Sequence, residues 1–211
     1  MAKRPNPAPE TVVGQVTGVI LAGGKARRMG GIDKGLVSIN GRAMVSYVID
    51  ALRPQVATLL LNANRSRDRY REFGLPVIAD ADGDFRGPLA GFASGMRVAE
   101  TPYIAVAPCD SPLLCGDMVQ RLYDALQKEG TRIAVAHDGS RLQPVFVLLD
   151  CTLLDDLAGH LADGGRKIDH WYGIHGYAVA DCSDVPESFL NINAPDDKQL
   201  LENMLTQRGP A

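Results

Sequence analysis

The residues whose types and spacing best suit chemistry lie in one glycine-rich loop between positions 23 and 34. Its four cations are Lys25, Arg27, Arg28 and Lys34, and a pair of glycines stands on each side of the Arg pair. Glycine lets backbone N–H groups approach a ligand closely, and lysine and arginine neutralise phosphate. Because an apolar run ends directly before this loop, we predict a polyphosphate-binding loop at the end of a strand.

This loop differs from the two most common phosphate-binding loops. A P-loop needs Ser or Thr directly after Gly-Lys, whereas Ala26 follows Gly24 and Lys25 here. The dinucleotide-binding pattern G-x-G-x-x-G is not met in register, because Gly23 and Gly24 are adjacent. A surface turn with solvated charges is the simpler alternative, but it explains poorly why glycine pairs bracket the Arg pair.

Polar residues also follow three further apolar runs, at Asn62, Asp80 and Asp110. Ligands of open parallel sheets bind outside the carboxyl ends of the strands, so we expect these side chains near the loop. Asp110 is the candidate metal ligand, because one carboxylate can hold Mg²⁺ while water and phosphate oxygens fill its other positions. The alternatives are structural: Asp110 capping a turn with Ser111, and Asn62 forming an Asx turn.

The elements that must position these residues alternate between short apolar runs and helical patterns. The predicted strands cover 16–22, 58–62, 77–79, 103–107, 133–136, 145–149 and 177–179. The predicted helices cover 44–52, 67–73, 89–98, 116–128, 153–161 and 195–205. Such alternation is typical of an α/β protein whose mainly parallel central sheet carries helices on both faces. We expect residues 15–205 to form a single domain, and residues 1–14 and 206–211 to be disordered.

Composition and charge argue against several classes of function. The net charge is −3, so general affinity for nucleic acid is not expected. No apolar run reaches the ~20 residues that cross a membrane, and the N-terminus lacks the apolar core of a secretion signal. The four cysteines form no C-x-x-C pair, so we expect reduced thiols and a cytoplasmic protein. Cys109 fits a buried structural residue better than a nucleophile.

The end of the apolar run and the glycine-rich loop together resemble the signature of nucleotidyltransferases that activate sugar phosphates, isoprenoid precursors and molybdopterin. The matching residues are 21–24, 28–30 and Lys34. The fuller string 24–35 is most similar to one branch, the molybdenum cofactor guanylyltransferases of the MobA family. A second motif of that branch resembles residues 191–195, which read Asn-Ile-Asn-Ala-Pro. The similarity extends from about residue 17 to residue 205.

This resemblance implies a three-layer Rossmann-like nucleotidyltransferase fold and transfer of GMP from GTP to molybdenum-molybdopterin, with release of pyrophosphate. It places GTP against Leu21, Ala22, Gly23, Lys34, Asn62, Asp80 and Asp110. It assigns Mg²⁺ to Asp110 and catalysis to Arg28, Lys34 and Asp110. Asn191 and Asn193 are the candidate contacts to molybdopterin. Molybdoenzyme chaperones and other cofactor-biosynthesis proteins are further candidate partners, and a monomer is expected.

The sequence leaves two other kinds of function open. The same chemistry could use CTP with the same cofactor, or act on a sugar 1-phosphate. A non-catalytic nucleotide-binding protein that delivers cofactor is the third candidate, and the presence of both Lys34 and Asp110 argues against it. Guanylyl transfer needs no Ser-His-Asp set, because the second pKa of a phosphomonoester is about 6 and the acceptor is already an anion.

Overall fold

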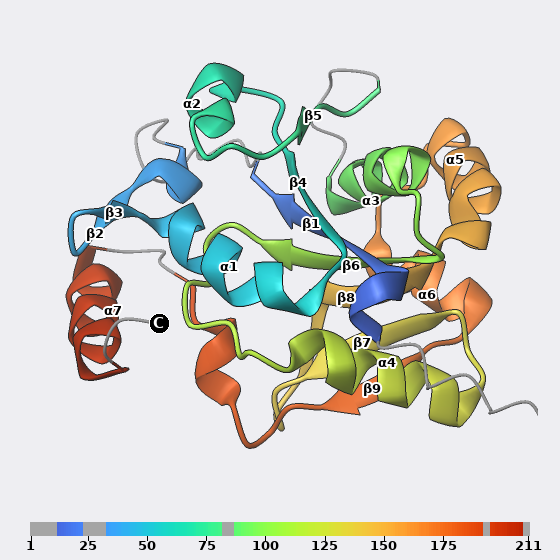
Figure 1. Cartoon of the computed structure of the whole chain (residues 1–211). Helices are drawn as coiled ribbons and strands as arrows, with labels where there is room; N and C mark the ends of the chain where they lie inside the picture. The colour runs from blue at the N-terminus through green and yellow to red at the C-terminus, as the bar shows by residue number, and fades with distance from the viewer. Residues whose placement is uncertain (1–11, 23–32, 82–86, 192–194, 209–211) are drawn as a thin grey trace, which may run out of the picture.

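The computed structural model describes residues 12–22, 33–81, 87–191 and 195–208, and its centre is a seven-stranded sheet (Figure 1). The strand order is β5-β4-β1-β6-β8-β7-β9. The strands are β1 (Val16–Leu21), β4 (Thr58–Asn62), β5 (Val77–Ile78), β6 (Tyr103–Pro108), β7 (Ile133–His137), β8 (Leu142–Asp150) and β9 (Ala178–Asp181). Strand β8 alone of these seven runs antiparallel to its neighbours. The predicted α/β class with a mainly parallel sheet is therefore confirmed.

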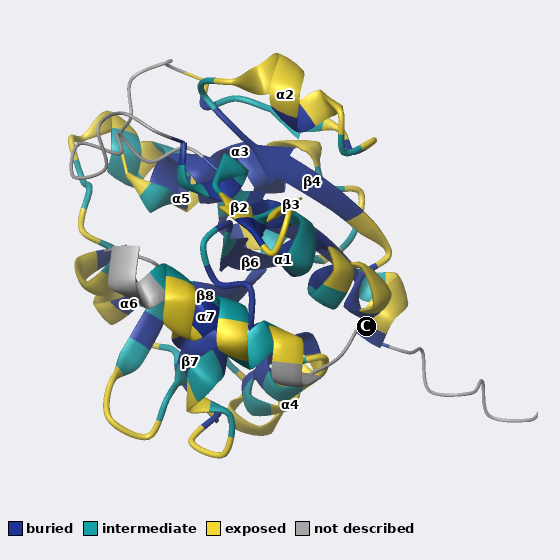
Figure 2. Ribbon diagram, turned by 90° about the vertical axis from the view of Figure 1, so that its left-hand side faces the viewer, coloured by how far each residue is buried: buried dark blue, intermediate teal, exposed yellow. Residues whose placement is uncertain are grey.

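Helices cover both faces of the sheet, which gives three layers (Figures 1 and 2). The helices α1 (Met44–Leu52) and α4 (Met118–Glu129) pack into one core cluster. The helices α3 (Pro88–Val98), α5 (Leu154–Ala162) and α6 (Ile168–His175) pack into the cluster on the other face. Two further helices, α2 (Arg67–Arg71) and α7 (Pro195–Arg208), lie at the periphery and expose much of their surface (Figure 2).

Local sequence patterns account for the main helices and for the central strands. In α1 the buried side chains Val45, Val48, Ile49 and Leu52 recur at helical spacing, as predicted. Helix α4 ends at Gly130, whose φ of 62° is the left-handed conformation that glycine adopts without a steric cost. The central strand β6 has Ile104 to Ala107 buried, in agreement with its lack of polar alternation.

Several elements differ from the sequence-based expectation. Helix α6 was not predicted, because its eight residues include two histidines and a glycine and carry only a weak apolar periodicity. The hairpin of β2 (Ser38–Ile39) and β3 (Arg42–Ala43) was also not predicted. Its turn residues Asn40 and Gly41 both have positive φ, so this Asn-Gly pair was a readable hairpin signal.

Described elements extend beyond the expected domain limits at both ends. Residues Val12–Gln15 form a 3-10 turn, and Val12 is buried in the core although residues 1–14 were expected to be disordered. Helix α7 continues to Arg208, three residues beyond the predicted limit at Leu205. Leu201 of α7 belongs to the same core cluster as Ile39 of β2, so this helix packs against that strand. Across the described ranges, no helix has the length and apolarity needed to cross a bilayer.

Candidate active site

The carboxyl ends of β1, β4, β5 and β6 meet at one edge of the sheet, which we call the carboxyl rim. In register, Leu21 at the end of β1 lies beside Asn62 of β4 and Pro108 of β6. Asp80 and Asp110 each follow two residues after the end of their strand. The four strands are parallel, so the predicted convergence of their ends is confirmed. Gly23 and Arg28 lie outside the described residues, as does most of the glycine-rich loop.

Lys34 and Asp110 form an ion pair at this rim. The Lys34 Nζ donates to Asp110 Oδ2 over 3.2 Å, and the side chains are 26% and 16% exposed. Lys34 begins a 3-10 turn, Lys34–Leu36, and Asp110 follows β6, so the pair joins positions 76 residues apart. A partly exposed ion pair contributes only about 0–1 kcal/mol to folding. The pair nevertheless places a cation and a carboxylate side by side at the rim.

A buried cluster below Lys34 holds the start of that turn. The Tyr70 hydroxyl of α2 donates to Asp33 Oδ1 over 2.6 Å, and Arg65 Nε lies 3.7 Å from Asp33 Oδ2. Burial raises the pKa of the Tyr70 phenol far above its usual range, so the hydroxyl keeps its proton. A Cβ on Gly35 would meet the Tyr70 hydroxyl at 2.6 Å, so only glycine fits there without a shift. The sequence analysis did not predict this cluster. The one sequence feature that pointed to it is the Asp-Lys-Gly string at 33–35.

A second buried cluster joins the ends of β4 and β5. The Asp80 carboxylate accepts from Asn62 Nδ2 over 3.0 Å through Oδ1 and from Asn64 Nδ2 over 2.6 Å through Oδ2. The Asp80 backbone N–H donates to Asn64 Oδ1 over 2.8 Å. Asn62 and Asp80 were both predicted site residues and are brought together here, whereas Asn64 was not predicted. Its position two residues after Asn62, in the polar segment that follows β4, was the available signal.

Helix α3 packs tightly against this second cluster. A Cβ on Gly91 would meet Leu21 Cδ2 at 2.6 Å and Asn62 Oδ1 at 2.9 Å. The Asn62 carbonyl also accepts from the Ala22 N–H over 2.8 Å. Leu21, Ala22 and Asn62 are therefore held in one packed unit at the rim.

The chain segment after the 3-10 turn Pro186–Phe189 reaches the same edge from the other half of the molecule. The Ser111 hydroxyl donates to Asn191 Oδ1 over 2.6 Å, across 80 residues of sequence. Asn191 thus lies next to the chain that leaves β6. Asn193, the second residue predicted to contact molybdopterin, lies outside the described residues.

Cys109 is a buried thiol in this arrangement. Burial raises the pKa of its thiol well above the usual range, and the adjacent Asp110 charge raises it further. Its backbone N–H donates to the Leu21 carbonyl over 3.0 Å, which continues the pairing of β6 with β1. The structural interpretation of Cys109 is supported by its burial.

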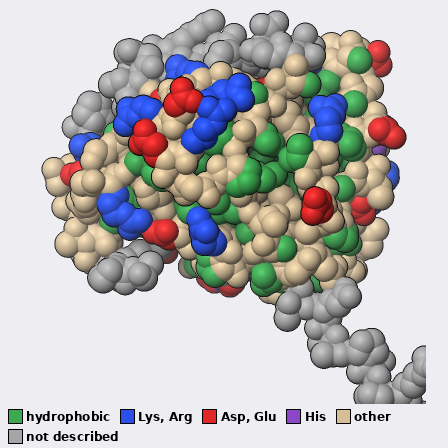
Figure 3. Space-filling model, turned by 45° about the horizontal axis from the view of Figure 1, so that its top comes forward, with side chains coloured by type: hydrophobic (Ala, Val, Ile, Leu, Met, Phe, Trp, Pro, Cys, Tyr) green, Lys and Arg blue, Asp and Glu red, His purple; other side chains and the backbone are tan. Residues whose placement is uncertain are grey.

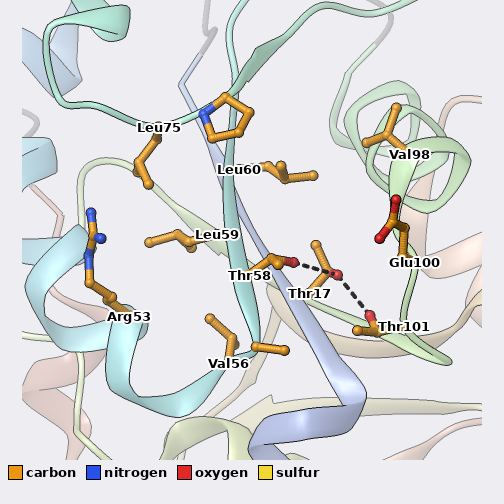
Figure 4. Close-up of a pocket in the computed structure, with 12 residues that line it drawn as sticks. Thr17, Arg53, Val56, Thr58, Leu59, Leu60, Leu75, Val98, Glu100 and Thr101 are labelled. Atoms are coloured by element: carbon orange, nitrogen blue, oxygen red, sulfur yellow. Dashed lines mark hydrogen bonds between the residues drawn. The ribbon is translucent and has the colours of Figure 1, made fainter.

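A cavity of about 700 Å³ opens at the opposite edge of the sheet, where β1 and β4 begin (Figure 4). Thr17 lies at its floor and shares hydrogen bonds of 3.0 Å with the Thr58 hydroxyl and 2.7 Å with the Thr101 hydroxyl. Leu59, Leu75 and other apolar side chains form its walls. This cavity is remote from the carboxyl rim and has no part in the candidate site.

Surface charge is mixed on the face shown in Figure 3. Blue lysine and arginine side chains stand there beside red aspartate and glutamate side chains and around a central green apolar area. The visible charges thus form no continuous stripe of one sign, unlike the usual footprint for a nucleic-acid backbone.

Comparisons with known proteins show similarity over most of the chain. Residues 18–175 match the family model of the MobA-like NTP transferase domain. The chain is 49% identical over 193 residues to a protein of Shewanella sediminis (strain HAW-EB3) named molybdenum cofactor guanylyltransferase, covering 92% of this chain and 98% of that protein.

Solved structures show the same fold at low sequence identity. Molybdopterin-guanine dinucleotide biosynthesis protein A of Archaeoglobus fulgidus superposes with a TM-score of 0.75 at 21% identity, covering 90% of this chain and 99% of that one. A 4-diphosphocytidyl-2C-methyl-D-erythritol synthase of Anaerococcus prevotii has a TM-score of 0.69 at 10% identity, covering 92% and 99%. The family model and the near-full-length relative establish that this chain belongs to the MobA-like NTP transferases.

Proposed function

We propose that this nucleotidyltransferase transfers GMP from GTP to the phosphate of molybdenum-molybdopterin and releases pyrophosphate. The observation that carries the proposal is the 49% identity, over nearly the whole of both chains, to a protein named molybdenum cofactor guanylyltransferase. The fold alone is shared with a structure named for cytidylyl chemistry, so it does not choose the nucleotide.

We place GTP at the carboxyl rim. The proposed contacts are Leu21, Ala22, Gly23, Lys34, Asn62, Asp80 and Asp110. Of the described members, Leu21 and Asn62 are paired in register at the ends of β1 and β4, Ala22, Asp80 and Asp110 follow within two residues of a strand end, and Lys34 contacts Asp110. Lys34 supplies a positive charge for phosphate, and Arg28 is proposed to add a second one. Gly23 is proposed to let the chain approach the phosphates closely.

The Asp80 carboxylate suits guanine among the nucleotide bases. Guanine presents two adjacent donors, N1–H and N2–H, on its Watson–Crick edge, and a carboxylate accepts such a pair in a fork. Each carboxylate oxygen can accept more than one hydrogen bond, so the bonds from Asn62 and Asn64 leave acceptor capacity for a base. Cytosine lacks two adjacent donors on this edge, and this difference favours GTP over the CTP alternative.

The donor set at the rim fits a magnesium ion held mainly by substrate. Among the described residues, no three side chains of His, Cys, Asp or Glu gather into a metal-binding group. Asp110 is therefore the one carboxylate we assign to the ion. Mg²⁺ is commonly bound by one or two carboxylates together with phosphate oxygens and water, which matches this arrangement. When bound, it would neutralise charge on the phosphates of GTP.

The transfer itself needs positioning and charge neutralisation more than proton transfer. An oxygen of the acceptor phosphate forms a bond to the α-phosphorus of GTP, and the bond from that phosphorus to the bridging oxygen of pyrophosphate breaks. The attacking oxygen is already anionic near neutral pH, since its second pKa is about 6. Lys34 stabilises charge on the phosphates, and backbone N–H groups of the glycine-rich loop are proposed to do the same.

The direct test is pyrophosphate release with each of GTP, CTP, ATP and UTP, in the presence of Mg²⁺ and molybdenum-molybdopterin. We expect release with GTP that depends on the acceptor. Asp110→Asn should lower the rate by about 100-fold or more, because a positioned electrostatic group of this kind is worth that much. The folded variant should melt close to the parent, since the Lys34–Asp110 pair is partly exposed.

A surface carboxylate serves as the control. Asp124→Asn on α4 removes an exposed acid remote from the rim and should leave the rate unchanged. Equal rates with CTP and GTP would refute the guanylyl assignment. Near-normal turnover by folded Asp110→Asn would refute its role at the metal.

A further inference from the structure

Asn64 holds Asp80 at two points, unlike any other side chain described at the carboxyl rim. Its amide nitrogen donates to Asp80 Oδ2 over 2.6 Å, and its amide oxygen accepts the Asp80 backbone N–H over 2.8 Å. These two bonds link one side chain to both the carboxylate and the main chain of the same residue. Rotation of the Asp80 side chain away from its position would break the first bond while the second still held the backbone.

The two asparagines of this cluster have different surroundings. Asn62 is 4% exposed and is packed against Gly91 of α3, so α3 and β1 hold it in place. Asn64 is half-buried in the loop after β4 and touches Asp80 with both ends of its amide. The Ala63 N–H donates to the Ile78 carbonyl over 2.8 Å, which keeps this loop segment alongside β5. Asn64 is thus carried on paired backbone directly opposite Asp80.

Resting on the proposed function, we infer that Asn64 is a positioning residue for Asp80 and sets the discrimination for guanine. With one oxygen held by Asn62 and the other by Asn64, the plane of the Asp80 carboxylate is fixed from both sides. A carboxylate fixed in this way presents its remaining acceptor positions in one orientation. Two adjacent base donors can then be matched together, whereas a base with one donor leaves one of these remaining acceptor positions of a buried carboxylate unfilled.

Inosine 5′-triphosphate isolates this readout from the rest of the nucleotide. It keeps the N1–H donor, the ribose and the triphosphate of GTP but lacks the 2-amino group. The ratio of the ITP and GTP dissociation constants therefore reports the second hydrogen bond to Asp80. A hydrogen bond to a charged group corresponds to roughly a 10- to 100-fold difference, so we expect the parent to bind GTP at least about 10-fold more tightly than ITP.

The experiment is calorimetric titration of GTP and of ITP, with Mg²⁺, into the parent and two variants. Asn64→Ala removes both bonds to Asp80. Asn64→Asp keeps the size and the acceptor for the Asp80 N–H, but it replaces the donor to the carboxylate by an acceptor and adds a negative charge beside Asp80. We expect the preference for GTP to fall below about 3-fold in both variants, mainly because GTP binding weakens. Thermal unfolding confirms that each variant is folded, and the near-isosteric Asp variant decides the matter if the Ala variant does not fold.

Gln120→Ala is the matched control. Its amide donates to the Asp124 carboxylate over 2.7 Å on exposed α4, away from Asp80, so the preference for GTP should stay at the parent value. A folded Asn64 variant that keeps the parent's preference overturns the inference and leaves the proposed function standing. A parent that binds CTP or ATP as tightly as GTP overturns the proposed function, and the inference with it.

Discussion

Asp33 shows how a single buried residue helps to position the lysine beside it, Lys34. Its side chain is 8% exposed, and its carboxylate lies between the Tyr70 hydroxyl and Arg65. A buried carboxylate is costly unless it accepts hydrogen bonds, so these partners determine where the backbone at Lys34 begins its turn. The proposed role of Lys34 in phosphate binding therefore depends on side chains that do not reach the rim themselves.

Tyr70→Phe tests this dependence at the scale of one atom. It removes the hydroxyl that donates to Asp33 and should lower the free energy of unfolding by about 1–3 kcal/mol, the usual cost of leaving a buried acceptor unmatched. We also expect a several-fold weaker affinity for GTP, because the turn that carries Lys34 is less firmly held. Denaturant unfolding and nucleotide titration measure the two effects.

Tyr47→Phe is the control for this variant. Its hydroxyl donates to the neutral Ile39 carbonyl over 2.9 Å, so it should lose less stability and keep the parent's affinity for GTP. Unchanged GTP affinity in a destabilised Tyr70→Phe would show that the buried cluster stabilises the fold without positioning Lys34.

At the scale of elements, the approach of α3 to the sheet determines the shape of the rim. The buried glycines Gly91 and Gly95 let this helix pack directly on β1: a Cβ on Gly95 would meet Val19 Cγ2 at 2.8 Å. A Cβ on Gly91 would instead press on Leu21 and Asn62. Glycine costs helix stability, so its presence at these positions is explained by the close packing.

Gly91→Ala should therefore affect both the fold and the site. The added methyl group must displace Leu21 or Asn62, which overpacks the interface and should cost roughly 1–3 kcal/mol of stability. Because Asn62 also contacts Asp80, we expect weaker GTP binding as well. Thermal unfolding and calorimetric titration provide the two measurements.

At a second helical glycine, the same substitution is expected to raise stability. Gly159 of α5 has no atom within 4 Å of an added Cβ, so Gly159→Ala should stabilise the protein by about 0.5–1 kcal/mol and leave GTP binding unchanged. If Gly91→Ala behaved like Gly159→Ala, the close contact between α3 and the rim would not matter for the nucleotide.

At the scale of the whole molecule, two parts of the chain meet at the rim. The first four parallel strands carry the residues proposed for GTP, and the segment at Asn191 arrives from the C-terminal half to bond with Ser111. We propose that this second part faces molybdopterin. The arrangement would bring both substrates to one edge of the sheet, with Asp110 next in sequence to the residue that binds Asn191.

Replacing Asn191 and Asn193 together by Ala tests this division. We expect impaired binding of molybdopterin and an almost unchanged affinity for GTP, both measured by calorimetric titration. Ser111→Ala, which removes only the partner hydroxyl, should have a smaller effect of the same kind. A loss of stability of about 1 kcal/mol with both affinities intact would assign these asparagines to turn or cap formation. A loss of GTP affinity alone would reverse the two halves.

Much of this architecture could be predicted from local patterns in the sequence. The periodicity of apolar residues placed α1 at 44–52 and β4 at 58–62, with the bounds that the structure has. Parallel β-α alternation then brought Asn62, Asp80 and Asp110 to one edge, because the carboxyl ends of parallel strands lie together. These features depend on residues that are close in sequence, and local sequence therefore determined them.

Only the tertiary structure decided which side chains complete the site. The contacts of Asn64 with Asp80, Tyr70 with Asp33 and Ser111 with Asn191 join residues 16, 37 and 80 positions apart. The insertion of β8 between β6 and β7 is likewise a matter of pairing between distant segments. From the sequence alone, a short polar side chain is equally well assigned to a turn or to a helix cap. Its role is decided only when packing brings a distant partner within hydrogen-bonding distance.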